Sequence, residues 1–134
     1  PKEPPKMVVF FSERVKPVMK SLKRACKYPA EEEAVLEAVV AVHELASTTY
    51  EVRSKLGSIG ACDALVILLD KCRANAELVV QIFRAMGALM ICNDTNTVKM
   101  GQLGGCRLCV RMMAVHSEDP SVLEACCKLL VEFG

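Results

Sequence analysis

Tryptophan is absent from this chain, and other aromatic residues are few, with four phenylalanines and two tyrosines among 134 residues. This scarcity argues against an aromatic-rich sandwich or barrel. Net charge is nearly absent as well, because 17 Lys and Arg residues against 16 Asp and Glu residues leave +1. Such a chain has no overall field to recruit nucleic acid or an anionic membrane. The longest apolar run, residues 64–69, is far short of the ~20 residues that a membrane span needs.

The residues that are present indicate an aliphatic, helical domain. Hydrophobic residues make up 52% of the chain and charged residues 25%, a balance that excludes intrinsic disorder. At this length the chain is one domain that buries roughly two-thirds of its unfolded surface. It begins at Pro1 and stops at Gly134 in the middle of a pattern, so we expect a fragment of a longer chain.

The eight cysteines are predicted to be reduced thiols rather than a disulfide framework. Seven of them lie in apolar stripes, where a small buried side chain fits. Cys72 stands beside Lys71 and Arg73 and is predicted to lie near the surface. This usage is typical of a cytoplasmic or nuclear protein. The seven in apolar stripes are Cys26, Cys62, Cys92, Cys106, Cys109, Cys126 and Cys127.

An internal repeat with an offset of 44 residues organises the chain. The segment Gly57–Cys62, GSIGAC, reappears as Gly101–Cys106, GQLGGC, and residues 64–69 align with residues 108–113. Further apolar positions recur in three sets at internal steps of 4, 3, 1 and 3, the spacing of one helical face. The sets are Ala34, Ala38, Ala41, Val42 and Leu45; Leu78, Ile82, Ala85, Met86 and Leu89; and Val122, Cys126, Leu129, Leu130 and Phe133.

Capping residues and glycines divide the chain into predicted helices. Asp119 precedes Pro120, Asn75 precedes an apolar stretch, and three glutamates follow Pro29, all features of helix starts. The glycines at 57, 60, 101, 104 and 105 are predicted to turn one helix sharply into the next. The predicted helices are 14–27, 30–47, 50–57, 61–72, 76–92, 96–101, 105–115 and 120–133.

Helical units of this period, each too small to bury its own apolar face, are typical of α-solenoids. Residues 60–69, GACDALVILL, and residues 104–113, GGCRLCVRMM, carry a resemblance to the second helix of the armadillo repeat family. The resemblance implies an all-α fold, a right-handed α-solenoid of about two and a half to three three-helix repeats. The single domain, 1–134, would comprise a flexible lead-in (1–13), a degenerate first repeat (14–56), a second repeat (57–100) and an incomplete third repeat (101–134).

The resemblance also implies that partners bind on the concave face formed by the third helices. Family members that grip extended peptides carry a Trp and, four residues later, an Asn on each third helix. The Trp positions correspond here to Val40, Arg84 and Lys128, and the Asn positions to Glu44, Ala88 and Glu132. Because neither residue type is present, binding of nuclear-localisation signals is not expected. The candidate partner-binding residues are Glu37, Val40, Glu44, Gln81, Arg84, Ala88, Lys128 and Glu132, which simple solvation of a helix face would also explain.

A basic face on the first predicted helix is a separate candidate. The first 27 residues carry eight basic and two acidic residues, or +6, which leaves −5 for the remainder. One reading is an electrostatic anchor for acidic lipid or nucleic acid, and the other is a solvated helix face. No aromatic residue is interleaved to stack bases, so nucleic acid and membrane are not expected partners. The face comprises Lys16, Lys20, Lys23, Arg24 and Lys27.

No catalytic constellation is apparent, and no cofactor is expected. Cys106 and Cys109 have zinc-ligand spacing, and His116, Cys126 and Cys127 could complete a site, but the repeat register explains Cys106 and Cys126 as core positions. The leading interpretation is therefore a non-catalytic scaffold or adaptor that binds protein partners, without a metal. Exposed solenoid ends are also expected to favour self-association.

Overall fold

The computed structural model describes residues 5–134, and within this range it is helical without a strand, which confirms the all-α prediction. None of the described helices has the length and apolarity to cross a membrane. The elements are α1 (Lys6–Phe10), the π-helical turn η1 (Phe11–Val15), α2 (Lys16–Lys27), α3 (Glu32–Ala46), α4 (Tyr50–Ser58), α5 (Ala61–Lys71), α6 (Ala76–Met90), α7 (Asp94–Gln102), α8 (Gly105–Val115) and α9 (Pro120–Phe133).

Helix boundaries follow the offset of 44 residues. The first and last residues of α3, α4 and α5 lie 44 positions before those of α6, α7 and α8, and α9 starts 44 positions after α6. Capping residues recur at the same offset. Asn75 Oδ1 and Asp119 Oδ1 accept from backbone N–H groups at the starts of α6 and α9, while Thr49 Oγ1 and Asn93 Oδ1 do so for α4 and α7.

The glycines have two different roles. Gly60 and Gly104 precede α5 and α8 with φ of 101° and 87°, the left-handed conformation that a sharp turn requires. Gly57 and Gly101 instead lie within the last turns of α4 and α7, each one residue before the end of its helix, whereas the predicted helices 50–57 and 96–101 end at these glycines. Residues 57 and 101, where the second and third predicted repeats begin, therefore lie inside helices, and α4–α6 correspond to α7–α9 at the offset of 44 residues.

The prediction of a flexible lead-in over residues 1–13 is wrong from Lys6 onward, because the chain is helical from there through to Lys27. Phe10 and Phe11 pack against the core, and Val15 is fully buried. The π-helical turn precedes Pro17, whose ring would clash with a carbonyl four residues earlier in a regular helix. There the Lys16 N–H bonds to the Phe11 carbonyl, five residues back. Residues 1–4 of the predicted lead-in lie outside the described residues.

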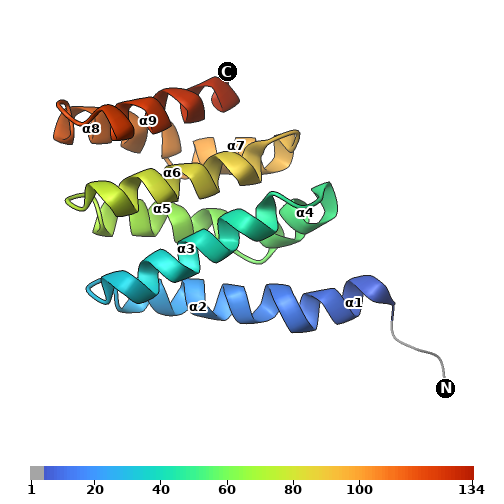
Figure 1. Ribbon diagram of the computed structural model, residues 1–134. Coiled ribbons are helices and arrows are strands. Elements are labelled where there is room, and N and C mark those ends of the chain that lie inside the picture. Colours follow the sequence, from blue (N-terminus) through green and yellow to red (C-terminus); the bar gives the residue numbers. More distant parts are fainter. Residues whose placement is uncertain (1–4) are drawn as a thin grey trace.

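The longest helices pack in the order of the sequence. Helix α3 packs against α2 and α6, and α6 packs against α3 and α9, while α5 packs against α2 and α6. Figure 1 shows α3, α6 and α9 side by side, with α2 on one side of this row and α9 at its other end. Helices α3 and α6 therefore each have a side that faces the next long helix along the chain.

The apolar stripes found in the sequence form most of the core. Eleven of the fifteen positions are buried, and all five on the central helix α6 are among them. Ala34 is exposed and Ala41 half-buried on α3, and Leu130 and Phe133 are half-buried on α9. The four positions that are not buried thus lie on α3 and α9. Among the three helices α3, α6 and α9, only α6 has another of the three on both sides.

Four cysteines depart from the predicted burial. Cys72, predicted near the surface, is buried directly after α5, next to Lys71, whose Nζ donates to the Cys26 carbonyl of α2. Cys92, Cys106 and Cys127, predicted in buried stripes, are exposed. The equivalents of Cys106 and Cys127 one repeat earlier, Cys62 and Phe83, are fully covered, whereas no described helix packs beyond α8 and α9.

Candidate functional site

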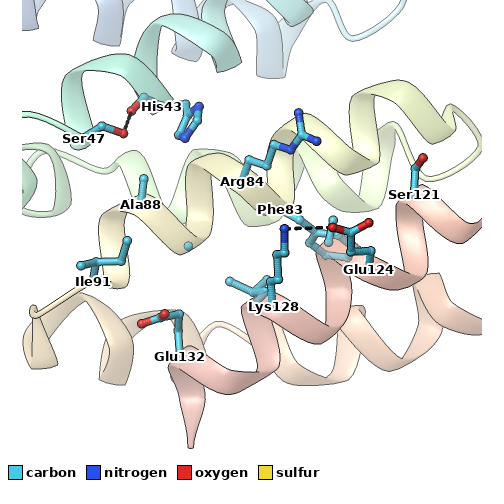
Figure 2. Close-up of a pocket in the computed structure, with 13 residues that line it drawn as sticks. His43, Ser47, Phe83, Arg84, Ala88, Ile91, Ser121, Glu124, Lys128 and Glu132 are labelled. Carbon is cyan, nitrogen blue, oxygen red and sulfur yellow. Dashed lines mark hydrogen bonds and ion pairs between the residues drawn. The ribbon is translucent and has the colours of Figure 1, made fainter.

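A groove runs between α6 and α9, and His43 and Ser47 at the carboxyl end of α3 also contribute to its lining (Figure 2). Its volume is about 310 Å³. The floor is apolar and includes Phe83 from α6 and Leu129 from α9, both almost fully buried. Gly87 forms part of this floor, and a Cβ placed on it would lie 3.7 Å from Leu129 Cδ1. The absence of a side chain at Gly87 keeps this part of the groove open.

Charged side chains form the rim. Lys128 Nζ lies 2.9 Å from Glu124 Oε1, four residues earlier on α9. The hydrogen bond from Lys128, its charge and the more distant charge of Arg84 hold the pKa of Glu124 below its ordinary value. Arg84 is exposed on α6 and has no ion pair or hydrogen bond within the described residues. Arg84 is therefore the cation of this groove that is available to a ligand (Figure 2).

The hydroxyls and imidazole near the groove are not arranged as a catalytic set. Ser47 Oγ donates to the backbone oxygen of His43 at 2.7 Å, so its hydrogen is committed there (Figure 2). The other lining hydroxyl, Ser121, makes no hydrogen bond to the His43 ring within the described residues. A nucleophile held by an adjacent base is thus not in place. The groove offers an apolar floor and charges, which suit binding.

The structure brings together half of the predicted partner-binding residues. Arg84, Lys128 and Glu132 stand at the groove between α6 and α9, and Ala88 is a buried part of its lining. Glu37 lies in a second groove, of about 350 Å³, between α2 and α3. The remaining predicted residues line neither groove; they are Val40, Glu44 and Gln81.

The basic face separates into two parts. Lys16, Lys20, Lys23 and Lys27 are exposed on α2 and form no ion pair within the described residues. Arg24 differs, because its Nη2 lies 3.3 Å from Glu31 Oε1 and its guanidinium is 4.7 Å from the Tyr28 ring centre. Arg24 lines the second groove together with both partners.

The cysteines with zinc-ligand spacing do not converge. Cys106 is exposed while Cys109 is buried, and Cys126 Sγ donates to the Cys109 backbone oxygen at 3.3 Å. Across residues 5–134, no three His, Cys, Asp or Glu side chains gather as metal ligands would. Burial raises the pKa of the Cys109 thiol and raises that of Cys62 to about 11. These thiols are protonated at neutral pH and are poor nucleophiles.

The raised pKa of Cys62 predicts alkaline destabilisation. A thiol of pKa 9.0 in the unfolded chain loses its proton at lower pH than Cys62 does in the folded protein. The unfolded state therefore binds fewer protons above pH 9, and stability, fully present below that pH, falls as pH rises toward 11. Between pH 9 and pH 11, the free energy of unfolding measured in urea is expected to fall by about 2 kcal/mol less in Cys62→Ala than in the wild type. The exposed Cys92→Ala is the control, and equal pH slopes for wild type and Cys62→Ala would contradict the prediction.

Several groove residues were not anticipated from the sequence. Glu124 stands four residues before Lys128, a spacing that indicates an ion pair on one helix face. This spacing could have identified Glu124 as a neighbour of the predicted residue Lys128. His43, Phe83 and Gly87 carry no such signal, because their place depends on how α3, α6 and α9 are rotated against one another. Comparisons with protein-family models, with curated proteins and with solved structures found no match to this chain.

Proposed function

We propose that this chain is a right-handed α-solenoid of armadillo-like repeats and acts as a non-catalytic scaffold that binds a protein partner in the groove between α6 and α9. The solenoid is supported by helix boundaries and caps that recur every 44 residues and by the packing of α3, α6 and α9 in sequence order. Stacked helices hold such a groove in place before a partner arrives, so little ordering entropy is lost on binding.

The observation that carries the proposal is the free cation above an apolar floor. Arg84 has no acidic partner within the described residues, whereas Lys128 is already paired with Glu124. A guanidinium binds a carboxylate through two parallel hydrogen bonds, and Ile91, which lines the same groove and is 46% exposed, offers apolar contact. The ligand that fits is a short peptide segment with an acidic residue close to an apolar one.

The alternative function, an electrostatic anchor, would use the lysines of α2. Those lysines have a simpler role, because a helix at the surface needs a polar side toward water. Such a side faces water whether or not it binds anything. The groove is therefore the stronger candidate.

A displayed library of short random peptides tests the groove. We expect the selected peptides to pair an acidic residue with a neighbouring apolar residue. The double variant Arg84→Glu/Lys128→Glu is expected to bind these peptides about tenfold more weakly or worse, because it replaces attraction by repulsion at the rim. Fluorescence anisotropy with one selected peptide measures the change.

The matched control is Lys20→Glu/Arg107→Glu, which makes the same change in net charge at two exposed residues outside the groove. Its affinity is expected to equal that of the wild type. Unchanged affinity in a folded Arg84→Glu/Lys128→Glu variant, or an equal loss in the control, would rule the groove out as the binding site.

A further inference from the structure

The groove between α6 and α9 holds one free charge of each sign. Arg84 on α6 and Glu132 on α9 both line the groove and are exposed, and neither forms an ion pair within the described residues. The other ammonium and carboxylate groups of the lining belong to Lys128 and Glu124, which are paired with each other. A ligand in the groove therefore meets one free cation and one free anion.

The two free charges lie about one helical turn apart along the groove. Helices α6 and α9 pack side by side, and Arg84 follows Ala76 by the same number of residues as Lys128 follows Pro120, at the starts of the two helices. Arg84 and Lys128 thus stand at the same level, and Glu132 lies four residues further toward the carboxyl end of α9 (Figure 2). At the helical rise of 1.5 Å per residue, this separation is about 6 Å.

The separation matches the repeat of an extended peptide. In an extended chain, residues two positions apart are about 6.6 Å apart and their side chains point to the same side. Two such side chains can therefore enter the groove together while the residue between them points away. One of the two would reach Arg84 and the other Glu132.

A helical ligand fits the groove less well than an extended one. One turn of helix, about 10 Å wide and 5.4 Å long, fills about 420 Å³. The groove has a volume of about 310 Å³, which is smaller than this single turn. A helix would also need four residues, rather than two, between side chains that are one turn apart.

From these positions we infer that the ligand of the groove is an extended peptide segment in which a basic residue lies two positions from the acidic one. The acidic residue pairs with Arg84 and the basic residue with Glu132. The inference rests on the proposed function and adds to it a second charge and a spacing. Ile91 stands at the same end of the groove as Glu132, so the apolar residue of the ligand lies at the basic end (Figure 2).

Two synthetic peptides test the second charge. Both keep the acidic and apolar residues of one sequence selected from the library, and the residue two positions from the acidic one, toward the apolar one, is Lys in the first and Glu in the second. The wild type is expected to bind the Lys peptide about fivefold more tightly at low ionic strength, because the Glu peptide places a carboxylate against Glu132. In Glu132→Lys this preference is expected to reverse. Fluorescence anisotropy measures all four affinities.

The matched control is Glu44→Lys, at the position of α3 that corresponds to Glu132 two repeats earlier. Glu44 is exposed and lines neither groove, so this variant is expected to keep the preference of the wild type. Equal affinity of the wild type for both peptides, an unchanged preference in Glu132→Lys, or a reversal in Glu44→Lys would each overturn the inference. Selection of acidic and basic residues four positions apart would overturn it too, in favour of a helical ligand.

The variant Arg84→Glu/Lys128→Glu separates this inference from the proposed function. If that variant loses affinity for the selected peptides while Glu132→Lys keeps the preference of the wild type, the groove is the binding site and only the second charge is wrong. If that variant binds as the wild type does, the groove is not the binding site, and the inference is wrong with it.

Discussion

Replacement of Gly57 by alanine is expected to lower the free energy of unfolding by about 3 kcal/mol. Gly57 lies in the last turn of α4 directly against Asn96 of α7, which is 2% exposed. A Cβ at residue 57 would lie 2.8 Å from Asn96 Cγ and closer still to its Oδ1. Atoms at such separations overlap, so the Asn96 side chain would have to move.

The Asn96 side chain cannot move without losing buried hydrogen bonds. Its Nδ2 donates to the Leu89 carbonyl at 2.8 Å and to the Arg53 carbonyl at 3.0 Å, joining α7 to α6 and α4. A buried polar group left without a partner costs about 1–3 kcal/mol. The loss of both bonds, together with the forced shift of α7, gives the expected magnitude.

The matched control is Gly101→Ala, one repeat later in the last turn of α7. A Cβ there would find its nearest neighbour, Phe133 Cε1, at 4.0 Å. Because alanine is favoured over glycine in a helix by about 0.5–1 kcal/mol, this variant is expected to be as stable as the wild type or slightly more so. Urea unfolding followed by circular dichroism measures both. Equal effects of the two substitutions on the free energy of unfolding would show that the contact with Asn96 is not what excludes a side chain at residue 57.

Helices were predictable from the sequence because their signals are local. Apolar spacing, capping residues such as Asn75 and Asp119, and the glycines at 60 and 104 act within a few residues, and the helices they predicted are present. The role of Gly57 was not predictable in this way. Its constraint comes from Asn96, whose repeat equivalent is Val52, so the offset of 44 residues gives no hint of it.

Burial and groove membership depend on neighbours rather than on periodicity. Cys62 and Cys106 share a repeat position, yet the first is buried and the second exposed, because only the first has a further unit packed on it. Arg84 and Lys128 were predicted together because both lie on third helices, and the structure places both at one groove. Glu37 and Glu44 belonged to the same prediction, but they lie on α3 and do not reach it.

Among the side chains between α6 and α9, Phe83 is the one whose removal is expected to lower the free energy of unfolding most. Phe83 is 1% exposed and lies beneath the groove, so Phe83→Ala removes an aromatic ring from a closed contact. Truncation of a buried Phe costs about 3–5 kcal/mol, from lost burial and from the cavity left behind. Urea unfolding is expected to show a loss in this range.

The location of the damage separates this contact from a general weakening of the core. Cys127 occupies the repeat position of Phe83 on α9 and is exposed, so Cys127→Ala is expected to change stability by less than about 0.5 kcal/mol. In Phe83→Ala, amide hydrogens of α8 and α9 are expected to exchange before those of α3, since the contact of α9 with α6 is weakened while α3 retains α2. Uniform loss of protection across α3, α6 and α9 would contradict this expectation. A loss of stability in Cys127→Ala as large as that in Phe83→Ala would contradict it as well. Either result would show that α9 is not held chiefly by its packing against α6.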